Sequence, residues 1–110
     1  RLDPAGSVVA VTGRAEAEAR DFDLVVNATP VGLTPDQPLP LDLSRCAGVG
    51  AVLDMVYAGK RVTPFVAHAR ELGISAADGT AMLLAQGAAA FTRWFGGEPP
   101  HDVMRAALRS

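Results

Sequence analysis

The sequence predicts an α/β fold built on a parallel sheet, because short apolar runs alternate with helical patterns. The runs at 23–28, 51–56 and 74–77 have the length of strands, and helical patterns at 64–72 and 79–95 follow the second and third. Alternation of this kind is typical of parallel strands joined by right-handed crossovers. The fold class expected is therefore a partial parallel sheet with helices at the C-terminal end.

The run at 23–28 (DLVVNA) is the clearest strand. Leu24, Val25 and Val26 are apolar without alternation, which predicts a strand covered on both faces. Pro30 ends it. In open α/β sheets ligands bind beyond the carboxyl ends of the strands, so this end of the sheet is where we expect a site.

Capping residues predict where the helices begin and end. Thr63 followed by Pro64 is a typical helix start, and Gly73 a typical end. Asp78 is expected to cap the long helix, which Gly96 ends. The other predictions are a strand at 7–11, a helical turn or loop at 12–19, a loop at 31–40, a short helix at 41–47, a turn at 48–50 and a last helix at 102–108.

The glycines of 48–50 do not predict a phosphate-binding loop. They precede a strand instead of following one, and the third glycine of the dinucleotide fingerprint is missing. We interpret the segment as a turn between a helix and a strand.

Composition limits the function classes. The chain has 110 residues, enough for one domain, and 49% of them are hydrophobic, which supports a packed core. The net charge of -2, without a block of like charges, gives no support for binding nucleic acid or a membrane surface. No apolar run approaches a membrane span. The single Cys46 fits a cytoplasmic location, and the absence of an initial Met suggests a piece of a longer protein.

Several polar side chains could carry binding or chemistry, and each has a structural alternative. Asn27 and Thr29 can bond neighbouring backbone or a ligand. Tyr57 follows the second strand and is either a hydrogen-bond donor to a ligand or a lid on the core. Gln86 lies in an apolar helical stripe, as a buried amide or a ligand contact. Gly79, on the same stripe, could let a ligand approach the backbone.

Other polar residues have simpler predicted roles. Asp54 is expected to accept structural hydrogen bonds, since an unpaired buried carboxylate is costly. His68 and His101 are expected to face solvent, and Lys60 to be a poor general base. No catalytic triad, metal-ligand spacing or paired carboxylates occur in the sequence, so no catalytic or metal-binding residue is predicted.

Three motifs together resemble the shikimate dehydrogenase family (shikimate/quinate dehydrogenases). NATPVG at 27–32 is similar to its NAT(P/S)xG segment, and DMVY at 54–57 with the later Thr63–Pro64 to its D-x-x-Y…TP block. DGTAMLLAQ at 78–86 resembles its DGxxMLxxQ helix start, except that Ala81 stands where the family often has glycine. The resemblance spans about residues 7–109.

The resemblance implies part of an NADPH-dependent enzyme that reduces 3-dehydroshikimate to shikimate in aromatic amino-acid (chorismate) biosynthesis. It implies a Rossmann-like cofactor domain, of which residues 1–110 would be the C-terminal part, without the first βαβ unit or the substrate domain. The catalytic Lys/Asp pair would lie outside the chain, so the chain alone is expected to be inactive. It implies NADP contacts by Asn27, Ala28, Thr29, Met55 and Gly79, and shikimate contacts by Tyr57 and Gln86.

The implied sites lie at three strand ends and one helix start, which are expected to form half of one pocket. The missing N-terminal half or a second copy of the chain would supply the rest. Two alternatives stay open: an NAD-dependent quinate/shikimate dehydrogenase, and a non-catalytic α/β binding module.

Overall fold

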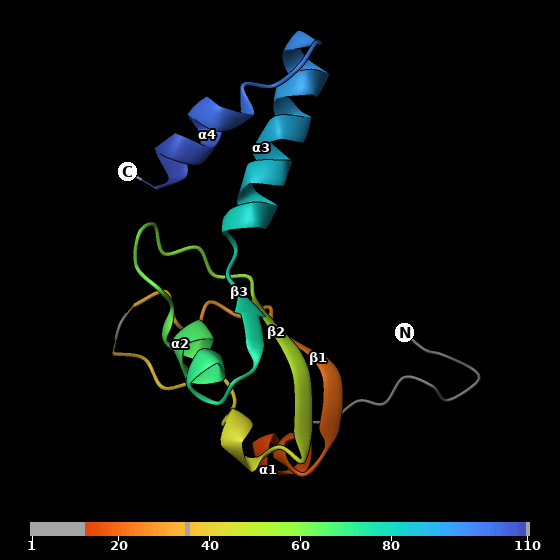
Figure 1. Ribbon diagram of the computed structural model, residues 1–110, viewed down its shortest axis with the longest axis vertical. Coiled ribbons are helices and arrows are strands. Elements are labelled where there is room, and N and C mark those ends of the chain that lie inside the picture. The colour runs from red at the N-terminus through yellow and green to blue at the C-terminus, as the bar shows by residue number, and fades with distance from the viewer. Residues whose placement is uncertain (1–12, 35, 110) are drawn as a thin grey trace, which may run out of the picture.

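The computed structural model describes residues 13–34 and 36–109 and has the predicted α/β architecture (Figure 1). The strand expected at 7–11 lies outside these residues. In chain order the elements are α1 (Arg14–Glu18), β1 (Asp21–Asn27), the 3-10 turn η1 (Leu43–Arg45), β2 (Gly48–Asp54), α2 (Pro64–Glu71), β3 (Ser75–Ala77), α3 (Thr80–Phe95) and α4 (His101–Leu108).

The described strands form one parallel sheet in the order β1-β2-β3. Val25 of β1 pairs with Val52 of β2, which pairs with Ala76 of β3. The strands therefore end at the same edge, as the α/β prediction requires. β2 begins at Gly48, so the turn predicted at 48–50 is wrong. A Cβ on Gly50 would lie 2.6 Å from the carbonyl oxygen of Asp23, and this close strand contact explains the glycine.

One face of the sheet is packed and the other is open. The core consists of Leu43, Val52, Phe65 and Ala69, so α2 and η1 cover the face that carries Val52. On β1, however, Leu24 is 55% and Val26 44% exposed. The prediction that this strand is covered on both faces is wrong, because no described element packs on the face of Leu24.

Helix α2 begins and ends as its sequence predicts. The Thr63 hydroxyl accepts a hydrogen bond from the Val66 N–H at 3.3 Å, Pro64 occupies the first turn, and Gly73 has φ of 76°. Phe65 and Val66 are each 1% exposed, whereas Leu72, which directly follows the helix, is 44% exposed.

The segments between β1 and β2 are held by short turns. The expected loop at 31–40 contains no helix or strand among its described residues. The short helix predicted at 41–47 is the single turn η1, which Asp42 caps by accepting a hydrogen bond from the Ser44 N–H. The helical-turn alternative at 12–19 is confirmed by α1.

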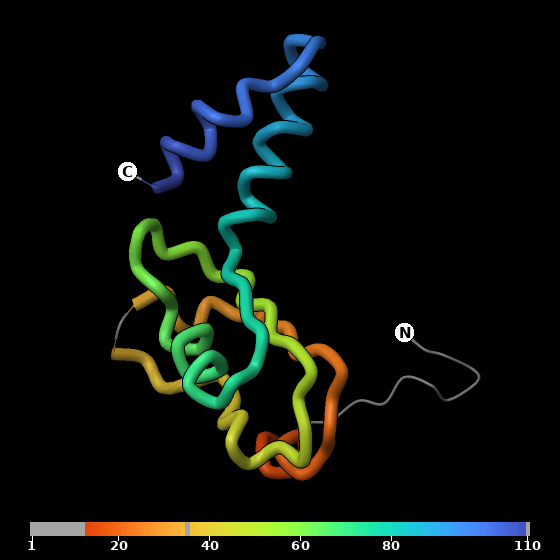
Figure 2. Tube along the Cα trace, viewed as in Figure 1, coloured from red at the N-terminus to blue at the C-terminus, as the bar shows by residue number. Residues whose placement is uncertain are grey.

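Helices α3 and α4 extend away from the sheet and form an antiparallel pair (Figures 1 and 2). Asp78 accepts a hydrogen bond from the Thr80 N–H at 2.9 Å, and Gly96, with φ of 71°, ends α3. Ala88 is the one described residue of α3 that is buried. The tube in Figure 2 shows α4 returning towards the loop after β2.

Within the part of the chain that the structure describes, no helix has the length and apolarity needed to cross a membrane.

Candidate functional site at the carboxyl ends of the strands

Asn27 ends β1 and is 4% exposed, and every hydrogen-bonding position of its side-chain amide is occupied by a protein group. Its Nδ2 donates to the Val31 carbonyl and to Asp54 Oδ1, both at 2.9 Å. Its Oδ1 accepts from the backbone N–H and the hydroxyl of Thr29, at 3.1 and 2.6 Å. A side-chain amide offers two donor and two acceptor positions, so Asn27 has none left for a ligand. Its role is to fix the turn at 28–31.

Asp54 ends β2 and is 0% exposed. Its Oδ1 also accepts a hydrogen bond from the Val56 N–H at 3.1 Å, and its Oδ2 accepts one from the Thr63 hydroxyl at 2.7 Å. Among the described residues no ion pair involves Asp54, so these hydrogen bonds are what offsets burial of the carboxylate. The predicted structural role of Asp54 is confirmed.

Thr63 completes this carboxyl-end network, which we define as Asn27, Asp54 and Thr63. Its hydroxyl donates to Asp54 and accepts from the Val66 N–H, so one group both caps α2 and joins it to β2. The network therefore fixes the ends of β1 and β2 and the start of α2 relative to one another.

A cavity opens beside this network. Its lining includes Asn27, Ala28 and Thr29, with Pro40, Leu41 and Phe65 on other sides. Ala28 and Thr29 are exposed. Because the Thr29 hydroxyl already donates to Asn27 and accepts from the Val31 N–H, a ligand here would meet mainly backbone and apolar groups.

Met55 and Gly79 lie against each other at the start of α3. A Cβ on Gly79 would lie 2.4 Å from the Met55 carbonyl oxygen, and the Gly79 N–H donates to the Val56 carbonyl at 3.1 Å. The glycine is thus explained by close packing of α3 on the chain after β2, and the expected NADP contact of Gly79 stays a prediction. The Met55 side chain is 42% exposed.

Tyr57 and Gln86 do not line the cavity formed by Asn27, Ala28 and Thr29. The Tyr57 hydroxyl donates to the Leu108 carbonyl of α4, and Gln86 is exposed on α3. The expectation that the strand ends and the helix start line one pocket is therefore not met by this cavity. The proposed roles of these two residues stay predictions.

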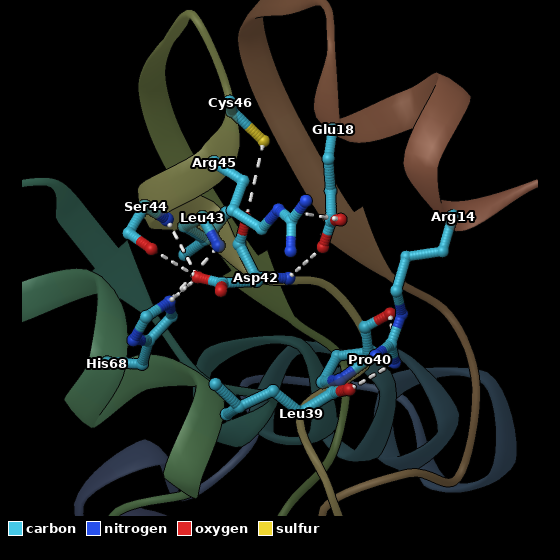
Figure 3. A network of polar contacts seen from close by, with 10 residues as sticks. All are labelled: Arg14, Glu18, Leu39, Pro40, Asp42, Leu43, Ser44, Arg45, Cys46 and His68. Carbon is cyan, nitrogen blue, oxygen red and sulfur yellow. Dashed lines mark hydrogen bonds and ion pairs between the residues drawn. The ribbon is translucent and has the colours of Figure 1, made fainter.

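A second polar network lies at the amino end of the sheet (Figure 3). Buried Glu18 accepts a hydrogen bond from the Asp42 N–H at 2.8 Å, and His68 Nε2 accepts one from the Leu43 N–H at 3.1 Å. The prediction that His68 faces solvent is wrong, since its side chain is only 18% exposed. His68 lies three residues after Phe65, on the buried stripe of α2, and this spacing could have revealed it.

Two groups of this amino-end network have shifted pKa values. Hydrogen bonds from the Ser44 side chain lower the pKa of Asp42, helped by its backbone N–H and by the nearby His68 and Arg45. Burial raises the pKa of the Cys46 thiol, and the charges of Glu18 and Asp42 raise it further. Among the described residues no cluster of three or more His, Cys, Asp or Glu could hold a metal ion.

Comparisons with known proteins show which enzymes this chain resembles. Residues 79–109 match the family model "Shikimate 5'-dehydrogenase C-terminal domain". The NADP(+)-dependent shikimate dehydrogenase of Geobacter sp. strain M21 is 49% identical over 87 residues, which are 79% of this chain and 30% of that protein. The chain is similar to shikimate dehydrogenases over most of its length, and residues 79–109 match their C-terminal domain.

Solved structures agree with this similarity. The shikimate dehydrogenase of Thermus thermophilus, solved with NADP(H) and shikimate, has a TM-score of 0.69 and 38% identity over 89% of this chain and 36% of that one. A 5-ketofructose reductase from a Gluconobacter species has a TM-score of 0.64 at 26% identity, covering 80% of this chain and 34% of its own. The chain thus spans about a third of the length of these relatives.

Proposed function

We propose that the chain is part of an NADP-dependent shikimate dehydrogenase, which reversibly reduces 3-dehydroshikimate to shikimate. In this proposal residues 1–110 are the C-terminal part of the NADP-binding domain. The observation that carries it is the similarity to NADP(+)-dependent shikimate dehydrogenases over 79% of the chain. The cavity beyond β1 supports it, because open α/β sheets bind ligands at this end.

The residues present fit an edge of a dinucleotide site. NADPH would supply the hydride when bound. Asn27 holds the turn that presents Ala28 and Thr29 to the cavity, and the exposed Met55 side chain offers an apolar surface next to the start of α3. We propose that Asn27 acts by positioning this turn, since its amide has no free hydrogen-bonding position.

We propose that Tyr57 and Gln86 bind shikimate, with Gln86 the stronger candidate. Gln86 is exposed, so its amide can reach a group supplied by a substrate domain. Tyr57 would first have to release the Leu108 carbonyl. Substrate choice should be tested directly, because a reductase named for a different substrate, 5-ketofructose, has a similar structure.

The test joins this chain to the complementary N-terminal part of a shikimate dehydrogenase and follows NADP reduction with shikimate. Gln86→Ala should raise the KM for shikimate about tenfold, as expected for loss of one substrate hydrogen bond. Thr92→Ala, on a different face of α3, is the control and should leave KM unchanged. Unaltered KM and kcat in the Gln86 variant would remove it from the site.

The two alternative functions need separate measurements. Comparing NADP with NAD, and shikimate with quinate, in the joined protein tests the NAD-dependent quinate/shikimate dehydrogenase. For a non-catalytic module, calorimetry on the 110-residue chain is decisive: we expect NADP affinity no better than about millimolar, because the phosphate cradle of a dinucleotide fold belongs to its first βαβ unit. Micromolar binding would favour the binding module.

We also propose that the missing N-terminal half, or a second copy, covers the open face of the sheet. The exposure of Leu24 and Val26 supports this, since strand side chains of this kind are normally packed. The cytoplasmic location expected from Cys46 stays a prediction.

A further inference from the structure

Two adjoining cavities meet at the start of α3. One, of about 310 Å³, has walls from α2, β3, α3 and α4, and the other, of about 390 Å³, lies between the loop after β2 and α3. Asp78, Thr80 and Arg109 line both, so the two cavities adjoin and make up one candidate site. We call it the basic groove, because its other charged lining residues are Lys60, Arg70 and Arg105.

The charge of the basic groove is opposite to that of the whole chain. The chain has 10 basic and 12 acidic residues and a net charge of -2. Four of those basic residues line the groove, with Asp78 as the one carboxylate among the lining residues. The groove therefore carries a formal charge of about +3, which draws anions to it.

This positive charge is largely uncompensated. Asp78 accepts a hydrogen bond from the Thr80 N–H, and the Arg70 guanidinium donates to the Ala76 carbonyl at 3.2 Å. Arg105 lies 3.5 Å from Asp102, but the Asp102 side chain is fully exposed and the pair is weak. No ion pair between described residues involves Lys60, Arg70 or Arg109. The positive end of the α3 dipole adds to the same field.

We propose that the basic groove binds a small molecule that carries a phosphate group. Arg70 of α2, Arg105 of α4 and Lys60 of the loop after β2 line it from different sides of the chain. Donors that approach from several elements suit a tetrahedral oxyanion, whereas a carboxylate accepts in one plane. The groove shares no lining residue with the cavity at Asn27–Thr29, although Asp78 and Thr80 flank Gly79 at the start of α3.

The test is an NMR titration of the 110-residue chain with inorganic pyrophosphate at low salt. We expect saturable shifts of the Ala77, Thr80 and Ala81 amides with a Kd of about 1 mM. Arg109 lines both cavities, so Arg109→Gln should weaken binding at least fivefold. Arg93→Gln, which removes a cation from the other end of α3, is the matched control and should change the Kd less than twofold.

Citrate provides the comparison with a carboxylate ligand and should bind at least fivefold more weakly than pyrophosphate. The proposal is overturned if pyrophosphate gives no saturable shifts, if Arg93→Gln weakens binding as much as Arg109→Gln, or if citrate binds equally well. Shifts confined to Ala28 and Thr29 would also overturn it. Both variants change exposed side chains, so circular dichroism should show that the fold is kept.

Discussion

A carboxylate organises each end of the sheet, but Asp54 and Asp42 do so in different surroundings. Asp54 is 0% exposed and accepts hydrogen bonds from Asn27, Val56 and Thr63. The Asp42 side chain is 41% exposed, and it caps η1 through Ser44. A buried carboxylate whose hydrogen-bond donors have no other acceptor stabilises the fold more than an exposed carboxylate that water can replace. The carboxyl end, where the candidate cavity lies, is therefore expected to be the more rigidly fixed.

The largest effect should come from Asp54→Ala. The change leaves donors of Asn27, Val56 and Thr63 unsatisfied in the interior, so we expect the free energy of unfolding to fall by about 3 kcal/mol. Urea unfolding followed by circular dichroism measures it. Asp42→Ala is the matched variant at the other end and should cost clearly less, because water can replace this exposed carboxylate as the cap of η1. Equal losses in the two variants would contradict the comparison.

Gly79→Ala tests the packing of α3 at the same carboxyl end. The new Cβ would lie 2.4 Å from the Met55 carbonyl oxygen, so the helix must shift, and we expect a loss of about 2 kcal/mol. Gly48→Ala is the control, because a Cβ there would lie 3.7 Å from the Asp21 Cβ, an ordinary van der Waals contact, and it should stay within about 0.5 kcal/mol. An unchanged unfolding midpoint in Gly79→Ala would show that α3 is free to move.

At the amino end, His68→Ala removes the acceptor of the Leu43 N–H. Leu43 is 3% exposed, so loss of this bond should cost about 1 kcal/mol in urea unfolding. His68→Gln keeps an acceptor on a side chain of similar reach and should recover part of the loss. If both variants are as stable as the parent, the histidine does not hold η1.

The smallest effect concerns Cys46. Its pKa is raised in the folded state by burial first and by Glu18 and Asp42 next, so the thiol binds its proton more tightly when folded than when unfolded. Its contribution to stability is complete below the ordinary thiol pKa and is lost as pH rises through the folded pKa, at alkaline pH.

Two measurements test this prediction. Alkylation of Cys46 by iodoacetamide at mildly alkaline pH should be several-fold slower than that of a short cysteine peptide, because less thiolate is present. Cys46→Ser should flatten the fall of stability at alkaline pH. Alkylation at the rate of the peptide would show that burial does not protect the thiol.

Local features of this chain could be predicted from sequence, and non-local ones could not. The Thr63–Pro64 helix start and the parallel strands follow from residue preferences over a few positions. The hydrogen bond from Tyr57 to Leu108 joins residues 51 positions apart, and no local pattern predicts it. The exposure of Leu24 depends on which element packs above it, which an apolar run does not reveal.

The candidate site shows the same contrast between local features, which the sequence predicts, and non-local features, which it does not. The sequence indicated that Asn27 and Thr29 bond either backbone or a ligand, and only the geometry shows that both are occupied within the protein. The structural role of Asp54 was predicted correctly, because a carboxylate in an apolar strand is tolerated only when it accepts hydrogen bonds. Whether Tyr57 and Gln86 line one pocket depends on where α4 packs. The spacing of residues in the sequence does not predict that position.

The contact between Arg70 and the carbonyl of Ala76 has a consequence for how the sheet can grow. An incoming strand that paired beside β3 would first have to displace this guanidinium, and charged side chains at an edge discourage such pairing. The β3 side of the sheet is thus protected against lateral addition of a further strand, whether from another polypeptide or another segment.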